Sequence, residues 1–344
     1  MHKTCHMLSI KHFLFLIIAS LLLFSCKDQA NKDKEVTGQY HPDPIINELT
    51  ILIKENPDDA ELFVSRARAF YEREGYDEAI YDMSRAMMID SINADYHHLL
   101  ADIYIDYYKS RLALSTMQRA VVLHPERIPT LLKLAELQTV LTFYDESMRT
   151  LDKALNVDPQ NAKAFLLMGI NFAYLQDTAR AIGSFQRSVQ IDPEYTDAWI
   201  KLARLRASRN EPNAIQFFDN AIKSSPGNVI PYMAKADFLW EEEQYDQAIE
   251  TFKEVIKLDQ SYEDAYYNIG LVYLEMDSIE MAHKHFDLTI NMNPLYHKAY
   301  YYRGLASEYL GNTESAIQDY EQCNNLEPTF TKAQDGIRRL KNKN

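Results

Sequence analysis

Glycine and cysteine are both scarce in this chain of 344 residues, and basic residues are fewer than acidic ones. Nine glycines are few for Rossmann, P-loop and β-rich folds, which need glycine at turns and phosphate-binding loops. Three cysteines exclude a scaffold built on disulfides. The 36 Lys and Arg against 50 Asp and Glu give a net charge of −14. This charge argues against general nucleic-acid binding, because contacts to phosphates require a basic surface.

A short hydrophobic run near the N-terminus predicts export. Residues 13–24 form a twelve-residue apolar segment, whereas a helix needs about 20 residues to cross a bilayer. Lys3 and Lys11 precede this segment and no acid does, an arrangement typical of a secretory signal peptide. The sequence Leu23-Phe24-Ser25-Cys26 resembles a bacterial lipobox. The resemblance implies that residues 1–25 are a signal, cleaved before Cys26, and that the Cys26 sulfur is lipidated. An ordinary signal peptide or an uncleaved anchor are the alternatives.

Residues 26–43 are expected to form the lipidated cysteine and a flexible tether, because the segment is polar and lacks apolar periodicity. Two or more acyl chains would make the anchoring stable. Lys27 follows the cysteine, and in bacterial lipoproteins this implies sorting to the outer membrane, with the periplasmic or surface face left open. Loss of Lys3 and Lys11 with the signal changes the net charge from −14 to −16. Cys323 would then be the single unmodified thiol.

Prolines reveal an internal repeat in the rest of the chain. Seven of the twelve prolines are spaced by 33 or 34 residues or by 68, which is twice 34. They are Pro57, Pro125, Pro159, Pro193, Pro226, Pro294 and Pro328. Ser91 and Gln260 stand at the two places where this period lacks a proline. A fixed period of this length indicates a repeat architecture.

Eight units follow from this period, and their small and large residues recur in register. The units are 60–93, 94–127, 128–161, 162–195, 196–228, 229–262, 263–296 and 297–330. Their eighth position holds Ala or Gly and their twentieth Ala or Ser, while the twenty-fourth holds a large apolar residue such as Phe252. This pattern resembles the tetratricopeptide repeat (TPR) family. The resemblance covers 60–330, or 271 residues.

The resemblance implies an all-α fold, a right-handed α-solenoid of about eight TPR helix pairs. In the seventh unit we expect helices at about 264–276 and 280–292, where apolar residues recur at helical spacing. Neither helix of a pair can bury its apolar face alone, so neighbouring units must stack. Residues 44–59 are predicted to be a capping half-repeat in phase with the array. Residues 331–344 are predicted to be a terminal solvating helix whose basic residues face water.

Catalytic and metal-binding motifs are missing from the sequence. It contains no Walker A, G-x-G-x-x-G, H-E-x-x-H, C-x-x-C or EF-hand pattern. We therefore predict no catalytic residue, no metal site, no cofactor and no small-molecule substrate. Cys323 occupies a unit position that holds Ala or Ser in several other units, which favours a buried small residue over a nucleophile.

The remaining function is binding, and the TPR resemblance places it in a concave groove. In TPR proteins the first helices line this groove, chiefly through unit positions 2, 5, 9, 12 and 13. Position 5 is apolar or aromatic in seven of eight units, and we extend this stripe by two residues of the fourth unit. The predicted partner-binding residues are Val64, His98, Leu132, Leu166, Ile170, Tyr174, Ile200, Met233, Tyr267 and Tyr301. Burial of position 5 by tight winding of the units is the alternative.

Charge at these groove positions predicts the chemistry of the partner. The forty positions hold twelve acids and four bases, so a cationic and apolar protein segment is favoured and anionic ligands, including nucleic acid, are disfavoured. The leading hypothesis is a non-catalytic, lipid-anchored scaffold in the bacterial envelope that binds a protein or peptide segment. The alternative is a structural subunit of an envelope secretion or assembly machine, and an envelope enzyme is the least favoured.

Overall fold

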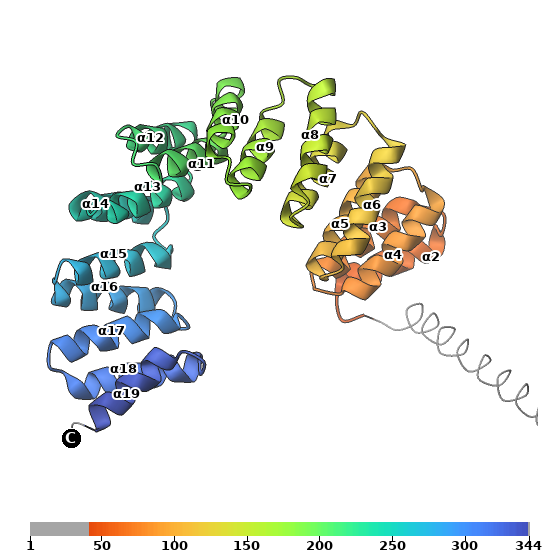
Figure 1. The fold of residues 1–344 in the computed structure, drawn as a ribbon. Helices are drawn as coiled ribbons and strands as arrows, with labels where there is room; N and C mark the ends of the chain where they lie inside the picture. The colour runs from red at the N-terminus through yellow and green to blue at the C-terminus, as the bar shows by residue number, and fades with distance from the viewer. Residues whose placement is uncertain (1–40, 343–344) are drawn as a thin grey trace, which may run out of the picture. The chain divides into compact units, whose positions relative to one another are not determined.

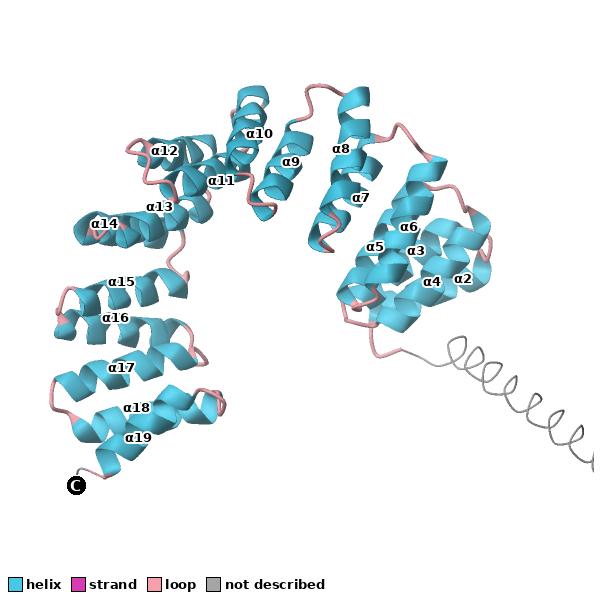
Figure 2. Cartoon of the chain, in the orientation of Figure 1, coloured by secondary structure: helices cyan, strands magenta, loops and turns pink. Residues whose placement is uncertain are grey.

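The computed structural model describes residues 41–342 (Figure 1). Within that range the chain forms eighteen helices joined by short loops, and no strand (Figure 2). None of the helices in this range is long and apolar enough to cross a membrane. The predicted signal, Cys26 and most of the predicted tether lie outside the described residues, as do residues 343 and 344.

Consecutive helices form pairs, which confirms the prediction of an all-helical array. The first helices of the pairs are α3 (Ala60–Tyr71), α5 (Ala94–Asp106), α7 (Ile128–Val140), α9 (Ala162–Tyr174), α11 (Thr196–Ala207), α13 (Val229–Glu241), α15 (Glu263–Glu275) and α17 (His297–Tyr309). The second helices are α4 (Tyr76–Ile89), α6 (Ser110–Leu123), α8 (Tyr144–Val157), α10 (Thr178–Ile191), α12 (Ala214–Ser224), α14 (Tyr245–Leu258), α16 (Ile279–Met292) and α18 (Thr313–Leu326). Helix α2 (Pro44–Glu55) precedes the first pair and α19 (Thr331–Lys341) follows the last.

The chain divides into two compact parts, with the boundary between Leu141 and Thr142. We call residues 41–141 the N-terminal part and residues 142–342 the C-terminal part, and describe each by itself.

A buried ion pair joins three helices of the N-terminal part. The Arg66 guanidinium donates to both carboxylate oxygens of Asp82, from Nε and Nη2, over 2.7 Å each. Its Nη1 donates to Thr50 Oγ1 on α2 over 2.9 Å. Both charged side chains are almost fully buried. Each compensates the charge of the other, which would be strongly destabilising if it were buried alone. Residues 16 apart in sequence therefore link α2, α3 and α4.

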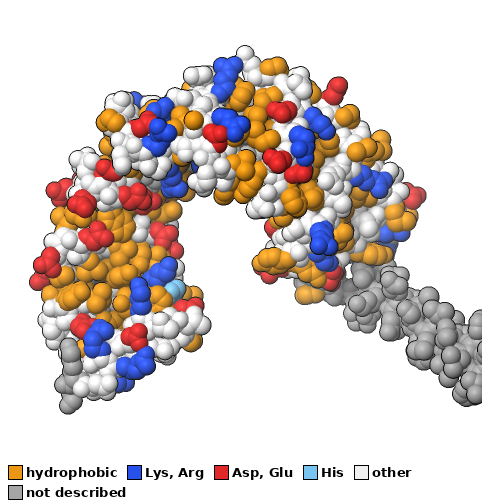
Figure 3. Space-filling view, viewed as in Figure 1, with side chains coloured by type: hydrophobic (Ala, Val, Ile, Leu, Met, Phe, Trp, Pro, Cys, Tyr) orange, Lys and Arg blue, Asp and Glu red, His pale blue; other side chains and the backbone are white. Residues whose placement is uncertain are grey.

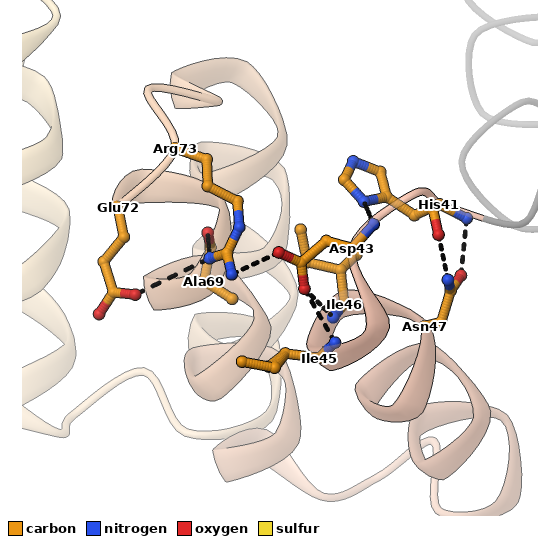
Figure 4. Close-up of polar contacts among 8 residues, drawn as sticks. All are labelled: His41, Asp43, Ile45, Ile46, Asn47, Ala69, Glu72 and Arg73. Carbon is orange, nitrogen blue, oxygen red and sulfur yellow. Dashed lines mark hydrogen bonds and ion pairs between the residues drawn. The ribbon is translucent and has the colours of Figure 1, made fainter.

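Polar contacts also fix the chain just before α2 (Figure 4). Asp43 caps this helix, since its carboxylate accepts from the backbone N–H of Ile45 and of the next residue, and it pairs with Arg73 beyond α3. The Asn47 side chain accepts from the His41 backbone N–H over 2.6 Å and donates to the His41 carbonyl. Residues 41–43, the end of the predicted tether, are therefore part of the fold.

The C-terminal part buries an aromatic ring at the twenty-fourth unit position of each of its last five pairs. Phe185, Phe218, Phe252, Phe286 and Tyr320 are at most 2% exposed. Glycine faces three of these rings at the eighth unit position: a Cβ on Gly169 would lie 2.5 Å from the Phe185 ring, and one on Gly270 2.6 Å from the Phe286 ring. The alternation of small and large residues in the sequence thus corresponds to a close approach between the two helices of a pair.

Each first helix ends in a left-handed residue at the fifteenth unit position. Seven of these residues are not glycine and have φ between 54° and 64°, while Gly311 has φ of 81°. The seven are Glu74, Tyr108, Thr142, Gln176, Asn210, Glu243 and Asp277. The backbone N–H of the following residue typically donates to a carbonyl five residues earlier, as from Ser278 to Tyr273 over 2.8 Å. This is the hydrogen bond of a Schellman motif, which usually has glycine at the left-handed position.

Candidate functional site

Half of the ten predicted groove residues lie in the core. Val64, Leu132, Leu166, Ile200 and Tyr267 are only 4–8% exposed. All but Leu132 belong to described core clusters that join their own pair to the neighbouring one. The Tyr267 ring lies 5.9 Å from that of Phe286 in its own pair and 5.0 Å from that of Tyr296, which leads into the next. For these five residues the structure shows burial, the alternative to an exposed stripe.

The other five predicted residues keep some exposure. His98 is half-buried, its Nε2 lies 2.9 Å from Thr130 Oγ1, and burial together with the nearby Lys133 and Arg127 lowers the pKa of its imidazole to about 4. Met233, Tyr301 and Ile170 are also half-buried. Tyr174 is 62% exposed and stacks on Tyr144, with ring centroids 5.5 Å apart.

Most acids at the predicted groove positions of the N-terminal part bind donors on the next or preceding pair. Tyr96 donates to Glu61 over 2.8 Å, and Tyr71 donates to Asp106. Asp95 pairs with Arg127 over 2.8 Å, and Asp102 pairs with Lys133 over 2.6 Å. These carboxylates connect consecutive pairs and are not simply a solvated acidic surface.

The C-terminal part uses three further acids in the same way. Tyr296 donates to Asp264 over 2.5 Å, and the Trp240 indole donates to Glu275 over 2.7 Å. Glu308 pairs with Arg339 of α19 over 2.6 Å. The sequence analysis did not predict these three bonds. The one feature of the sequence that could have indicated them is a donor residue 31 to 35 positions away from each acid.

Two acids on α13, Asp237 and Glu241, border both of two neighbouring pockets. The first pocket lies between α11 and α13, has a volume of about 530 Å³ and is also lined by Arg204, Phe218 and Phe238. The second lies between α13 and α15 and has a volume of about 590 Å³. Its wall includes Trp240, Tyr245, Asn268 and Glu275. We call the two together the α13 pockets.

Asp237 is a carboxylate without a donor. It is half-buried, and no described residue donates a hydrogen bond to it or forms an ion pair with it. Burial raises the pKa of this carboxyl; Arg204 opposes the increase and Glu241 adds to it. Glu241 is exposed and likewise binds no donor among the described residues. The two like charges lie one helical turn apart, an unfavourable spacing.

Aromatic rings form the walls beside these carboxylates. Phe238 stacks on the buried Phe218, with centroids 5.1 Å apart. Glu275 accepts from the Trp240 indole and lies near Tyr245, and both rings border the second pocket. Figure 3 shows acidic side chains gathered over α13 and α14, next to hydrophobic side chains over α15 to α17. The site can therefore offer a partner negative charge and aromatic surface at one place.

Within the described part of the chain, no group of residues comparable to the α13 pockets is arranged to bind a metal ion or to supply a nucleophile. In residues 41–342 no three His, Cys, Asp or Glu side chains are placed to hold a metal ion. Cys323 is fully buried, and burial raises the pKa of its thiol to about 11. A buried, protonated thiol is typical of a core residue, since nucleophilic cysteines have a lowered pKa.

Comparisons with known proteins identify the repeats. Tetratricopeptide repeat profiles match residues 166–229, 263–294 and 297–330, and a TPR repeat profile matches residues 236–277. Among curated proteins the chain is similar to anaphase-promoting complex subunit 7 of Dictyostelium discoideum, with 22% identity over 246 residues, which cover 70% of this chain and 41% of that protein. The chain spans less than half the length of the curated relatives it matches.

Solved structures show the same fold. A tetratricopeptide repeat protein from Parabacteroides merdae is similar with a TM-score of 0.51 and 20% identity, covering 72% of this chain and 98% of that one. The C-terminal part of a TPR repeat-containing protein from Cytophaga hutchinsonii is similar with a TM-score of 0.54 and 16% identity, covering 71% and 99%.

Proposed function

Because the chain carries tetratricopeptide repeats, we propose that it is a non-catalytic scaffold, held in the bacterial envelope by a lipid, that binds a protein or peptide segment on its first helices. The observation that carries this proposal is the pair of adjoining α13 pockets, which are bordered by charged, polar and aromatic side chains of three successive first helices. Repeat proteins commonly bind partners on such extended surfaces. A curated relative is itself a complex subunit by name.

The partner segment is cationic and partly apolar. Several of the twelve acids at the predicted groove positions are paired, but Asp237 and Glu241 bind no donor among the described residues and favour positive charge, and Tyr174 with Tyr144 adds exposed aromatic surface. Because these charges lie near solvent, binding should weaken as salt increases.

Site-specific photo-crosslinking in native envelopes tests the binding surface. A photoreactive residue at Tyr174 or Glu241, both exposed on first helices, should label a partner. The same residue at Gln190 or Gln247, exposed on second helices, should not label it. Labelling from the second helices alone would refute binding on the first helices.

The lipid anchor is proposed from Leu23-Phe24-Ser25-Cys26, and outer-membrane sorting from Lys27. Cys26→Ala should abolish labelling with radioactive palmitate and release the protein from membranes. Cys323→Ala is the matched control and should stay labelled and membrane-bound. Retention of Cys26→Ala in the membrane fraction would refute the anchor.

A permanent subunit of an envelope secretion or assembly machine is the alternative function, supported by the relative that is a complex subunit by name. The two functions predict different sizes for the particles that contain this protein in gently solubilised envelopes. A scaffold with exchangeable partners should run partly as a free protein, and a permanent subunit only in one large complex.

A further inference from the structure

Two carboxylates at the α13 pockets, Asp237 and Glu241, differ from three other groove acids of the C-terminal part. Asp264, Glu275 and Glu308 each bind a donor on a neighbouring pair or on α19. Asp237 and Glu241 bind no donor among the described residues, although both border the same two pockets. Paired carboxylates already bind a donor within the fold, whereas Asp237 and Glu241 border a pocket and stay available to a ligand.

Arg204 compensates the charge of Asp237 only in part, because it opposes the rise in the pKa of this carboxyl but does not cancel it. Its side chain lines the pocket between α11 and α13 but forms no ion pair with a described carboxylate. Among the residues that line the two pockets, Arg204 is the single base and there are five acids. The acids are Asp237, Glu241, Glu242, Glu243 and Glu275. An occupant with positive charge is therefore complementary to the site, and an anionic one is not.

The aromatic residues that line the pockets favour one type of cationic group over another. Phe238 and Trp240 both follow Asp237 on α13 and border the first and second pocket respectively. A guanidinium is planar, donates to two carboxylates at once and stacks on aromatic rings, whereas an ammonium is a compact point charge. Two carboxylates one turn apart beside aromatic rings suit the planar group.

We infer that the α13 pockets bind an arginine side chain of the partner segment, with its guanidinium bridging Asp237 and Glu241 against the ring of Phe238 or Trp240. This inference rests on the proposed function, because it names the residue by which the bound segment is recognised. Removal of Asp237 would take away the more buried of the two carboxylates. Removal of Arg204 would take away the nearby like charge and so strengthen binding.

Tryptophan fluorescence provides a direct test on the full chain. The chain has two tryptophans, so Trp199→Phe leaves Trp240 as the reporter at the second pocket. Acetyl-arginine amide is the probe, and acetyl-citrulline amide, which has the same shape without the charge, is its control. We expect the arginine probe to change Trp240 fluorescence with a Kd of about 1 mM, and the citrulline probe to bind at least tenfold more weakly.

Three charge variants complete the test. Asp237→Asn and Glu241→Gln should each weaken the arginine probe about tenfold, and Arg204→Gln should strengthen it about twofold. Glu314→Gln on α18 removes one exposed carboxylate elsewhere and should change nothing. Circular dichroism of each variant checks the fold, and Glu241→Gln, at an exposed site, keeps the test valid if Asp237→Asn unfolds.

Equal binding of the arginine and citrulline probes would overturn the inference, and so would unchanged arginine binding in a folded Glu241→Gln variant. A silent arginine probe together with crosslinking from Glu241 would refute the arginine site and leave the scaffold in place. Binding of the probe without any crosslinked partner would instead refute the proposed function.

Discussion

The same substitution, glycine to alanine, at Gly311 and at Gly183 tests the backbone conformation of the turns. We expect it to change the free energy of unfolding in opposite directions at the two positions. Both lie in the C-terminal part, and a Cβ added at either position would meet nothing within 4 Å. Gly311 has φ of 81° in the turn between α17 and α18, whereas Gly183 lies inside α10. Glycine to alanine therefore changes only the backbone preference at these two positions.

The expected change in the free energy of unfolding for Gly311→Ala is the difference between two contributions. A left-handed conformation costs an L-residue about 1–2 kcal/mol, and the lower entropy of alanine in the unfolded chain offsets about 0.4–1 kcal/mol of that. Gly311→Ala should thus lower the free energy of unfolding by about 0.5–1 kcal/mol. In α10, where φ is helical, Gly183→Ala should raise it by about 0.5–1 kcal/mol.

Urea denaturation of the full chain, followed by circular dichroism, gives the direction of each change. Repeat arrays can unfold in more than one step, so native-state hydrogen exchange should locate the effect. Amides of α17 and α18 should exchange faster in Gly311→Ala, and those of α9 and α10 more slowly in Gly183→Ala, because contacts stay between neighbours. Shifts of the same sign for both variants would refute this explanation.

The reverse substitution extends the prediction to the other turns. Tyr108 has φ of 57° and is 94% exposed, so Tyr108→Gly loses almost no contact and relieves the left-handed strain. It should raise the free energy of unfolding by about 0.5–1 kcal/mol. Tyr108→Ala, which keeps the strain, is the matched control and should have little effect.

Three further predictions concern buried groups. Asp82→Ala should cost about 3–5 kcal/mol in urea denaturation, because it leaves the Arg66 charge buried without a partner; Arg66→Met with Asp82→Leu should cost less, and an equal loss would contradict the explanation. The imidazole of His98, with a pKa of about 4, stays neutral in the fold while the unfolded chain takes up a proton below about pH 6.5. Stability should therefore decrease as pH falls from about 6.5 towards 4, by about 1 kcal/mol once the partial exposure of the side chain is allowed for, and a denaturation series for His98→Leu should lack this contribution. Cys323, fully buried with a raised pKa, should react with iodoacetamide at pH 8 in urea but not in the native protein; rapid native alkylation would show that its pair opens.

The repeat period and the small–large alternation predict the helix pairs and much of their core. The match between Gly169 and Phe185 is an example, because close packing of two helices leaves room for only one bulky side chain. The left-handed turns could not be predicted from the residue types, since glycine occupies only one of the eight turns, at Gly311. Tertiary packing of the helices on both sides overrides the local preference there.

The candidate site was less predictable than the fold. Position 5 can face either a groove or the neighbouring pair, and spacing along one helix does not distinguish these; the burial of Leu166 and Ile200 depends on how the next helix packs. The state of each acid depends on a donor in another pair, as for Glu275 and Trp240. Asp237 has the same residue type and helical setting as Asp102, and only the structure shows that one is paired and the other is not.

The bonds between consecutive pairs have a consequence for how such an array can change its length. The units share one pattern of 33 or 34 residues, yet the polar groups of each unit match one particular neighbour: Lys133 pairs with Asp102, and Tyr296 donates to Asp264. Duplicating, deleting or exchanging a unit would keep the apolar core and place these donors opposite the wrong residues. The units are alike in architecture but are not interchangeable, so the order of the repeats is itself encoded in their contacts.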